Sequence, residues 1–267
     1  MECDLSEVSI HPSSVISSEA IIEKGVSIGP FCTLRGRVRI GANTHLHSNV
    51  SIGIESGIVE IGEGNQIYPG CVLGGAPQDK KYKGEPTRLH IGNNNHIREH
   101  VTISLATATA KGTTKIGNNN MVMAYCHFGH DCEIGDDNVF ANASQLAGHV
   151  QIGNQVNVGG VCAFNQFVRV GDYAFLGGYS SVNKDILPYA IAQGNYAVMR
   201  ATNKIGMERG GMNAADIDGL HKAIRIIIKG SSTLSEGLQR IHDECTPSPA
   251  IEYLIRFIKE SKRGLAI

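Results

Sequence analysis

An aliphatic or aromatic residue recurs at every sixth position over most of the first 190 residues. The series runs through the ranges 10–52, 61–73 and 91–103, and then without a break from Ile116 to Val182. A period of six fits neither a 3.6-residue helix nor the two-residue alternation of a strand. It is typical of short strands joined by sharp turns, three to a coil of 18 residues. The pattern therefore predicts stacked triangular coils whose parallel strands pair about 4.8 Å apart.

Two further positions of the six-residue repeat support this prediction. The second position is often glycine, which adopts turn conformations closed to other residues. The fifth position is small or β-branched, and it holds five of the seven cysteines: Cys32, Cys71, Cys126, Cys132 and Cys162. We expect these thiols to pack inside the coils. An odd cysteine count without a CxxC pair argues against a disulfide framework or a zinc ribbon.

The six-residue rhythm stops near Asn195, and helical patterns follow. Asn213 and Gly230 bound an amphipathic stretch, Thr233 and Glu236 form a capping box for a second helix, and Ser248-Pro249 begins a third. We therefore expect a repeat domain over residues 1–190, with an extruded loop at 74–90, and a helical domain over 191–267.

Composition excludes several classes of function. The chain has 24 Lys and Arg against 25 Asp and Glu, for a net charge of -1, which argues against a nucleic-acid-binding protein. No apolar run approaches the roughly 18 residues of a membrane span. The start, Met1 to Asp4, resembles neither a signal peptide nor an Arg-rich transit peptide.

Candidate chemistry lies on the outside of the coils, because a prism filled with Ile and Val has no room for a substrate. His127, His130 and His149 lie within 23 residues. Counting by 18 places His130 under Gly148, and Asp131 under His149, so the two histidines should lie within ~5–8 Å on neighbouring coils. Such a cluster favours a general base or a metal site. Gly148, with an unshielded backbone N–H, is a candidate oxyanion donor.

Other chemistries lack their motifs. There is no GxSxG serine motif, no P-loop and no dinucleotide fingerprint, which disfavours a serine nucleophile, nucleotide hydrolysis and hydride transfer.

The repeat resembles that of the hexapeptide-repeat acyltransferases, whose fold is a left-handed parallel β-helix. Within them, six segments resemble the UDP-N-acetylglucosamine O-acyltransferases of lipid A biosynthesis. They are NQIY at 65–68, PQDKKYKGEPTR at 77–88, HFGHDC at 127–132, LAGHV at 146–150, IAQGN at 191–195 and the terminal RGL at 263–265. The resemblance implies a homotrimer with sites between subunits. It implies transfer of an (R)-3-hydroxyacyl group from acyl carrier protein to the 3-hydroxyl of UDP-GlcNAc.

The resemblance also implies roles for particular residues. His130 matches the general base, Asp131 would orient it, and Gly148 matches the oxyanion donor. The other matches are substrate-binding: Gln78, Asp79 and Lys81 in the loop; His127, His149 and Gln166; Asn203 and Arg209 near the nucleotide and phosphopantetheine; and Gly178 at the acyl-length position. No metal or cofactor is implied, since phosphopantetheine arrives on the donor. A bacterial member would be cytoplasmic, and a plant member would lie in a mitochondrion or another organelle.

Three positions depart from the family pattern. Asn165 stands in place of a histidine, Ile205 in place of an acidic residue, and Gly210 in place of a second arginine. The first puts a substrate contact in doubt, and the other two put nucleotide affinity in doubt, because an Arg–phosphate pair can contribute about 1.5–3 kcal/mol.

Three alternatives stay open. A γ-carbonic-anhydrase-like enzyme would bind zinc across a subunit interface through three histidines, here His127, His130 and His149. A non-catalytic scaffold would only assemble with partners. Another hexapeptide acyltransferase would use coenzyme A as donor or acylate an amine.

Overall fold

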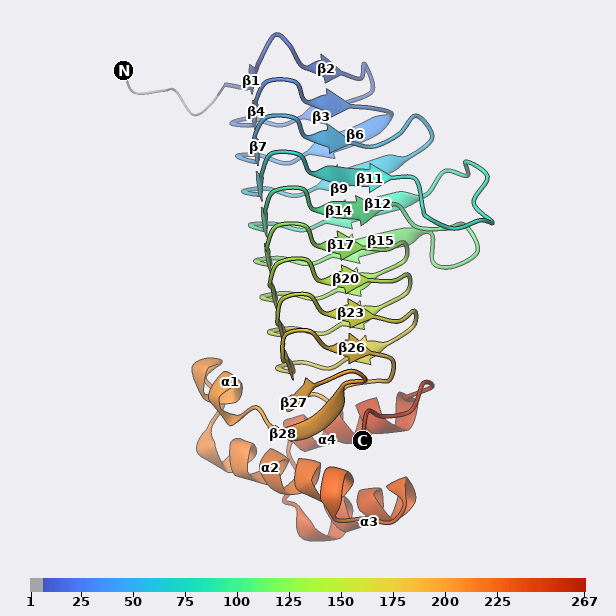
Figure 1. Ribbon diagram of the computed structural model, residues 1–267. Helices are drawn as coiled ribbons and strands as arrows, with labels where there is room; N and C mark the ends of the chain where they lie inside the picture. The colour runs from blue at the N-terminus through green and yellow to red at the C-terminus, as the bar shows by residue number, and fades with distance from the viewer. Residues whose placement is uncertain (1–6) are drawn as a thin grey trace.

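The chain forms a stack of coils followed by a helical region (Figure 1). A computed structural model describes residues 7–267; residues 1–6, which include the N-terminal segment considered above, lie outside it. The strands fall into three sheets, because from β4 to β26 each strand pairs with the strand three places before it along the chain. A coil contributes one strand to each sheet, as the 18-residue repeat predicts.

The first sheet has eleven strands in the described chain: β1 (Ser9–Ile10), β4 (Ser27–Ile28), β7 (His45–Leu46), β10 (Gln66–Ile67), β13 (His96–Ile97), β16 (Met121–Val122), β19 (Val139–Phe140), β22 (Asn157–Val158), β25 (Phe175–Leu176), β27 (Ala190–Gln193) and β28 (Val198–Thr202). The second has nine: β2 (Val15–Ile16), β5 (Thr33–Leu34), β8 (Ser51–Ile52), β11 (Val72–Gly75), β14 (Thr102–Ser104), β17 (His127–Phe128), β20 (Gln145–Leu146), β23 (Ala163–Phe164) and β26 (Ser181–Val182). The third has eight: β3 (Ile21–Ile22), β6 (Arg37–Ile40), β9 (Ile58–Ile61), β12 (Arg88–Ile91), β15 (Thr113–Ile116), β18 (Glu133–Ile134), β21 (Gln151–Ile152) and β24 (Arg169–Val170).

The side chains of the six-residue repeat (the hexad) face inward or outward as the pattern predicts. In a two-residue strand such as β20, Gln145 faces outward and Leu146 is fully buried. The cysteines at the fifth position are buried as well, and no disulfide joins the cysteines of residues 7–267. Burial raises the pKa of Cys132 to about 12, so this thiol stays protonated and packs as a small apolar group. The predicted fold class, a parallel β-helix followed by a helical region, is confirmed.

The corners of the coils place non-glycine residues in the left-handed region. Asp131 has φ 61° and His149 has φ 64°, and they occupy the same corner one coil apart. The stacked turns support this conformation, because the His149 N–H donates to the His130 carbonyl at 2.9 Å. The turns therefore fix the direction of two candidate site residues through the backbone.

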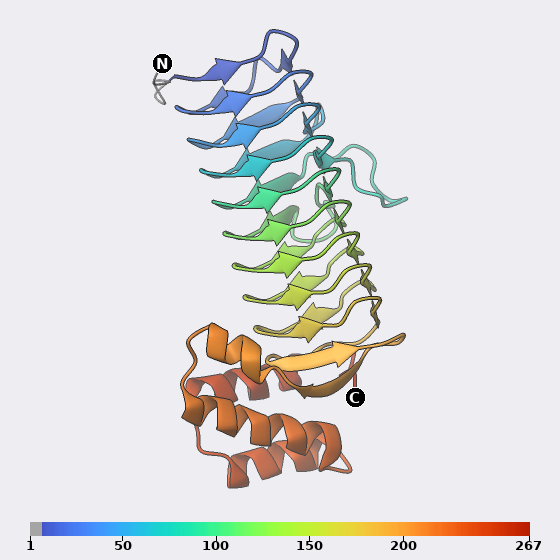
Figure 2. The same ribbon diagram turned by 60° about the vertical axis from the view of Figure 1, so that its left-hand side comes forward.

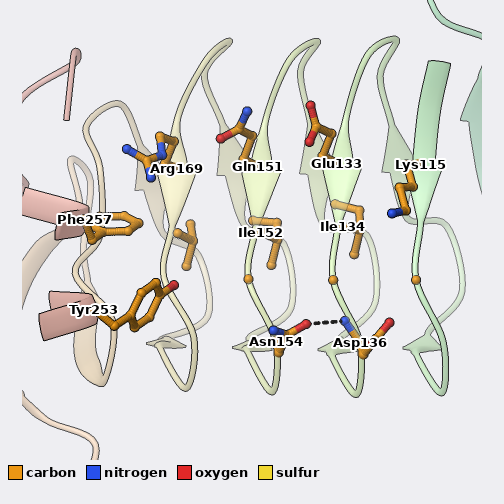
Figure 3. Close-up of a pocket in the computed structure, with 14 residues that line it drawn as sticks. Lys115, Glu133, Ile134, Asp136, Gln151, Ile152, Asn154, Arg169, Tyr253 and Phe257 are labelled. Carbon is orange, nitrogen blue, oxygen red and sulfur yellow. Dashed lines mark hydrogen bonds between the residues drawn. The ribbon is translucent and has the colours of Figure 1, made fainter. Parts of the chain in front are cut away.

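Amide side chains tie the coils together along the stack. Inside, Asn95 Oδ1 accepts from the N–H and Nδ2 of Asn120, while its own Nδ2 donates to Asn65 Oδ1 and to the Gly117 carbonyl. On the outside, the Asp136 N–H donates to Asn154 Oδ1 at 2.8 Å, which Figure 3 shows as a dashed line. These bonds supplement the strand pairing between successive coils.

The helical region contains α1 (Lys204–Arg209), α2 (Ala214–Lys229), α3 (Leu234–Glu244) and α4 (Pro249–Glu260). The caps predicted from the sequence are present, since Asn213, Thr233 and Ser248 each accept a hydrogen bond from the first turn of the following helix. Two elements were missed: α1, and β28, which pairs antiparallel with β27. β27 itself extends the coil stack past residue 190, because it pairs parallel with β25.

Two loops leave the stack on one side, to the right in Figure 1, and Figure 2 shows the longer of them from another angle. One joins β11 to β12 over residues 76–87, which is narrower than the expected 74–90 because Gly74–Gly75 and Arg88–His90 belong to strands. The other joins β14 to β15 over residues 105–112. None of the helices in the described part has the length and apolar character needed to cross a membrane.

Candidate active site

A buried histidine–aspartate pair lies at the corner between β17 and β18. The Nδ1 of His130 lies 2.8 Å from Oδ2 of Asp131, and the two residues are 5% and 6% exposed. With the ionised carboxylate as acceptor, Nδ1 carries the proton, and Nε2 keeps its lone pair free to accept one. The pair can therefore act as a general base whose orientation is fixed.

Gly148 lies against the ring of His130, as the count by 18 predicts. A Cβ at residue 148 would come within 2.6 Å of Nε2 and 2.5 Å of Cε1, so only glycine fits beside the ring. No backbone hydrogen bond within residues 7–267 has the Gly148 N–H as its donor. A free amide beside the basic nitrogen is the arrangement that an oxyanion donor requires.

His149 completes one side of the site. Its ring lies 5.0 Å from that of His130, within the expected range, and stacks on Phe167 at 4.4 Å. Burial lowers the pKa of His149, and the negative charges of Asp131 and Asp79 partly oppose that effect. His149 is thus mostly neutral at pH 7, which suits a hydrogen-bonding substrate contact.

His127 and Gln166 lie on the same side of the coils as the second sheet, one on a strand and the other in a turn. His127 lies on β17, where Nδ1 pairs with the hydroxyl of Thr102 at 2.7 Å, and burial lowers its pKa. Gln166 is exposed in the turn after β23, directly before Phe167. Asn165, the first departure, is exposed in the same turn.

The loop residues fall into two groups. The negative charge of Asp79 acts on His149, where it raises the pKa and so opposes the effect of burial. The Asp79 carboxylate accepts a hydrogen bond from the Lys81 N–H at 2.8 Å. Gln78 and the side chain of Lys81 are exposed. No contact joins these two side chains to His130 within the described chain.

A groove of about 560 Å³ runs from the site toward the C-terminal end. Asp131, His149 and Phe167 line one end of it, and Lys262 and Arg263 the other. It adjoins a smaller hollow of about 390 Å³ between the third sheet and α4, in which Arg169 lies over the ring of Phe257 (Figure 3). Of the site residues, Asp131 and His149 line the groove, whereas His130 and Gly148 do not.

Asn203 and Arg209 lie at a different corner, beside the first sheet. They line a separate cavity of about 720 Å³ with Phe175 and the two departures Ile205 and Gly210. Asn203 also has a structural use, because it caps α1 and its Nδ2 donates to the Tyr173 carbonyl. The structure does not bring this cavity together with His130 in one chain.

The glycine at position 210, the third departure, is explained by the side chains around it. A Cβ at this position would collide with the ring of Tyr173 and lie 2.7 Å from Gln155 Oε1. An arginine therefore does not fit here while Tyr173 occupies the adjacent coil.

Gly178 lies at the corner between β25 and β26, away from the histidine pair. It is exposed, and a Cβ there would lie 3.3 Å from the Gly160 carbonyl. A larger side chain would thus project from the surface rather than into the core.

Two residues that contribute to the site were missed from the sequence. Phe167 lies 18 positions after His149, so the repeat itself could have identified it. Thr107 donates to the carboxylate of Asp131 from the loop at 105–112. No sequence signal marks Thr107, because this loop interrupts the six-residue count.

The three-histidine set of the zinc alternative is not the cluster that forms. In residues 7–267, the group of His, Cys, Asp and Glu side chains whose ligand atoms lie within 4.8 Å of one another is His130, Asp131 and His149. His127 is outside it, so within one chain the three histidines do not form one cluster, and the zinc alternative, which places its ligands across a subunit interface, stays an alternative.

Comparison with known proteins identifies the class first. A model described as bacterial transferase hexapeptide (six repeats) matches residues 19–54 and 113–148, and one described as UDP N-acetylglucosamine O-acyltransferase, domain 2, matches residues 185–266. The fold and these matches define a hexapeptide-repeat acyltransferase.

Individual relatives narrow the class to a family. An acyl-[acyl-carrier-protein]--UDP-N-acetylglucosamine O-acyltransferase from Thermodesulfovibrio yellowstonii is 43% identical over 256 residues, which are 96% of this chain and 98% of the relative. The crystal structure of UDP-N-acetylglucosamine O-acyltransferase (LpxA) from Moraxella catarrhalis superposes with a TM-score of 0.92 at 41% identity, covering 97% and 99% of the two chains. The Arabidopsis enzyme superposes with a TM-score of 0.87 at 34% identity, covering 97% and 100%. The chain belongs to the UDP-N-acetylglucosamine O-acyltransferase family, LpxA, as the sequence resemblance indicated.

Proposed function

We propose that this protein transfers an (R)-3-hydroxyacyl group from acyl carrier protein to the 3-hydroxyl of UDP-GlcNAc, the first step of lipid A biosynthesis. The observation that carries the proposal is the buried His130–Asp131 pair, with Gly148 packed against the His130 ring and the Gly148 N–H donating no backbone hydrogen bond in the described chain. The names of the relatives supply the two substrates.

The reaction needs one base and one oxyanion donor. Nε2 of His130 takes the proton of the sugar hydroxyl as its oxygen attacks the thioester carbonyl. The Gly148 N–H stabilises the negative charge on the carbonyl oxygen. When the C–S bond breaks, the imidazolium returns its proton to the departing phosphopantetheine thiolate, so the products are the ester and the free thiol of the carrier. Asp131 holds the ring and balances the charge of the imidazolium.

The active unit in this proposal is a homotrimer. His130 lies between the second and third sheets, whereas Asn203 and Arg209 lie beside the first sheet of the same chain. A threefold assembly lets one subunit supply the base and its neighbour supply the nucleotide-binding groups. The same proposal has Gln78, Asp79, Lys81, His127, His149 and Gln166 contacting substrate and Gly178 setting the acyl length.

The direct test is to incubate the protein with UDP-GlcNAc and (R)-3-hydroxyacyl carrier proteins of several chain lengths, and to detect the acylated nucleotide sugar by mass spectrometry. His130→Ala should lower kcat by about 10²–10⁴, with a modest change in KM. A variant with near-normal turnover would exclude His130 as the base.

Mixed trimers test the shared site. We expect the variants His130→Ala and Arg209→Ala each to be impaired as pure trimers. In trimers co-assembled from both, about a quarter of the sites should combine two intact halves, and activity should return to that extent. A mixture no more active than the average of the two variants would show that each chain builds its own site.

The alternatives make different predictions. A coenzyme-A-dependent enzyme would accept acyl-CoA in place of the carrier protein, and an N-acyltransferase would require an amino sugar. A scaffold would tolerate His130→Ala without loss. The proposed reaction uses acyl carrier protein, which places it in the cytoplasm of a bacterium, or in an organelle such as the mitochondrion of a plant.

A further inference from the structure

The loop at 105–112 contacts the buried histidine–aspartate pair through Thr107. Thr107 is 4% exposed, and its hydroxyl donates to Oδ2 of Asp131 at 2.8 Å. Its backbone N–H lies 3.1 Å from the same oxygen and 3.3 Å from Oδ1. Both polar groups of one residue therefore converge on one carboxylate.

That carboxylate is the one that holds the catalytic ring. Oδ2 of Asp131 also accepts the hydrogen bond from Nδ1 of His130 at 2.8 Å. Rotation of the carboxylate about its Cβ–Cγ bond would carry Oδ2 away from the ring nitrogen. The hydroxyl of Thr107 opposes this rotation, since it holds the oxygen that His130 uses.

The loop is itself anchored, so Thr107 is a firm support. Leu105 is fully buried and its N–H donates to the Gly75 carbonyl at 2.9 Å. On the other side of the carboxylate, the Asp131 N–H donates to the Thr114 hydroxyl at 2.8 Å. The carboxylate of Asp131 is thus held by Thr107 in the loop, and its main chain by Thr114 in β15, the strand that follows the loop.

We infer that Thr107 is a positioning residue for the acyl transfer, acting through Asp131 to keep the ring of His130 aligned with the Gly148 amide. Thr107 does not touch the substrate or exchange a proton with it. This inference rests on the proposed function, because it assigns Thr107 to the base of that reaction.

The test is Thr107→Val, which removes the hydroxyl and keeps the shape and the backbone N–H. We expect kcat for acyl transfer to fall by about 10- to 100-fold with little change in KM for UDP-GlcNAc, since a misplaced group near the reacting atoms slows the step without weakening binding. Thr107→Ser should restore most of the rate. Thr109→Val is the matched control: its hydroxyl contacts Thr107 at 3.3 Å and has no bond to Asp131, so kcat should stay within about twofold.

A double-mutant cycle shows whether Thr107 acts through Asp131. In an Asp131→Ala background, Thr107→Val should have no further effect on kcat. An equal loss in both backgrounds, or a loss matched by a drop in Tm and not rescued by serine, would overturn the inference. Thr107→Cys serves in the same cycle if valine prevents folding.

The two proposals fail in different ways. If His130→Ala and Asp131→Ala keep full activity, the assignment of the base is wrong. If those two variants are inactive while Thr107→Val keeps the wild-type kcat, the reaction stands and the positioning role of Thr107 is refuted.

Discussion

Gly148→Ala tests how closely the base and the amide must fit. Gly148 is not among the residues with positive φ, so alanine can adopt its backbone conformation and only the added methyl acts. That methyl would lie 2.5–2.6 Å from Cε1 and Nε2 of His130, where van der Waals contact is about 3.5 Å or more, so the ring must move by roughly 1 Å. The move strains the 2.8 Å bond to Asp131, and the ring of His149, in T-shaped contact with that of His130 at 5.0 Å, limits the space further.

A displacement of this size should lower kcat by about 10²-fold, or roughly 2.7 kcal/mol of transition-state stabilisation. The assay is steady-state transfer to UDP-GlcNAc, with KM measured separately. Gly160→Ala is the control, because Gly160 holds the same hexad position and its added Cβ would meet nothing closer than 3.4 Å. Near-normal kcat in Gly148→Ala would refute the close fit, and an equal loss in Gly160→Ala would show a general effect of filling this turn.

Four further outcomes follow from the structure. Asn95→Ala removes a buried amide that serves four hydrogen bonds, and should lower the free energy of unfolding in urea by about 3 kcal/mol; a loss under 1 kcal/mol would show that the ladder adds little. Burial lowers the pKa of His127 below 6.5, so as the pH falls the unfolded chain binds a proton before the folded chain does. The contribution of His127 to stability is therefore full above pH 6.5 and is lost as the pH drops below it. In thermal unfolding, the Tm of His127→Gln should decrease less than that of the wild type over this pH range. Prolonged treatment with a chelator should leave the transfer rate unchanged, whereas a loss restored by zinc would favour the metalloenzyme. Gly178→Met should shift the preferred acyl length to shorter chains, and an unchanged length profile in the carrier-protein assay would remove Gly178 from that role.

The repeat made much of the site predictable. Because successive coils are 18 residues apart and in register, a count along the chain placed His130 against Gly148 and close to His149, as the structure does. The same reasoning put hexad cysteines such as Cys132 inside. Where the period is unbroken, residues 18 positions apart in the sequence are neighbours on successive coils.

The prediction fails where the period is interrupted. Thr107 reaches Asp131 across 24 residues rather than 18, because the loop inserts extra residues into that coil, and no pattern in the loop reveals where it folds back. α1 was missed for a related reason: its six residues are too few for a helical period, and its start depends on the Asn203 cap. No sequence pattern indicates which corner of the coils a residue beyond the repeat will lie at. The placement of His130 and Arg209 at different corners of one chain was therefore seen only in the structure.

The glycine at position 210, where the family has an arginine, is explained by a neighbouring side chain. The sequence suggested a missing arginine and weaker phosphate binding. In the structure the ring of Tyr173, from the adjacent coil, occupies the space that a Cβ at 210 would need, and Gln155 closes the other side. Any side chain at 210 would therefore require the side chains of Tyr173 and Gln155 to shift. Under the proposed function, nucleotide binding would then depend on Arg209, which lines the cavity with Phe175, rather than on a pair of arginines.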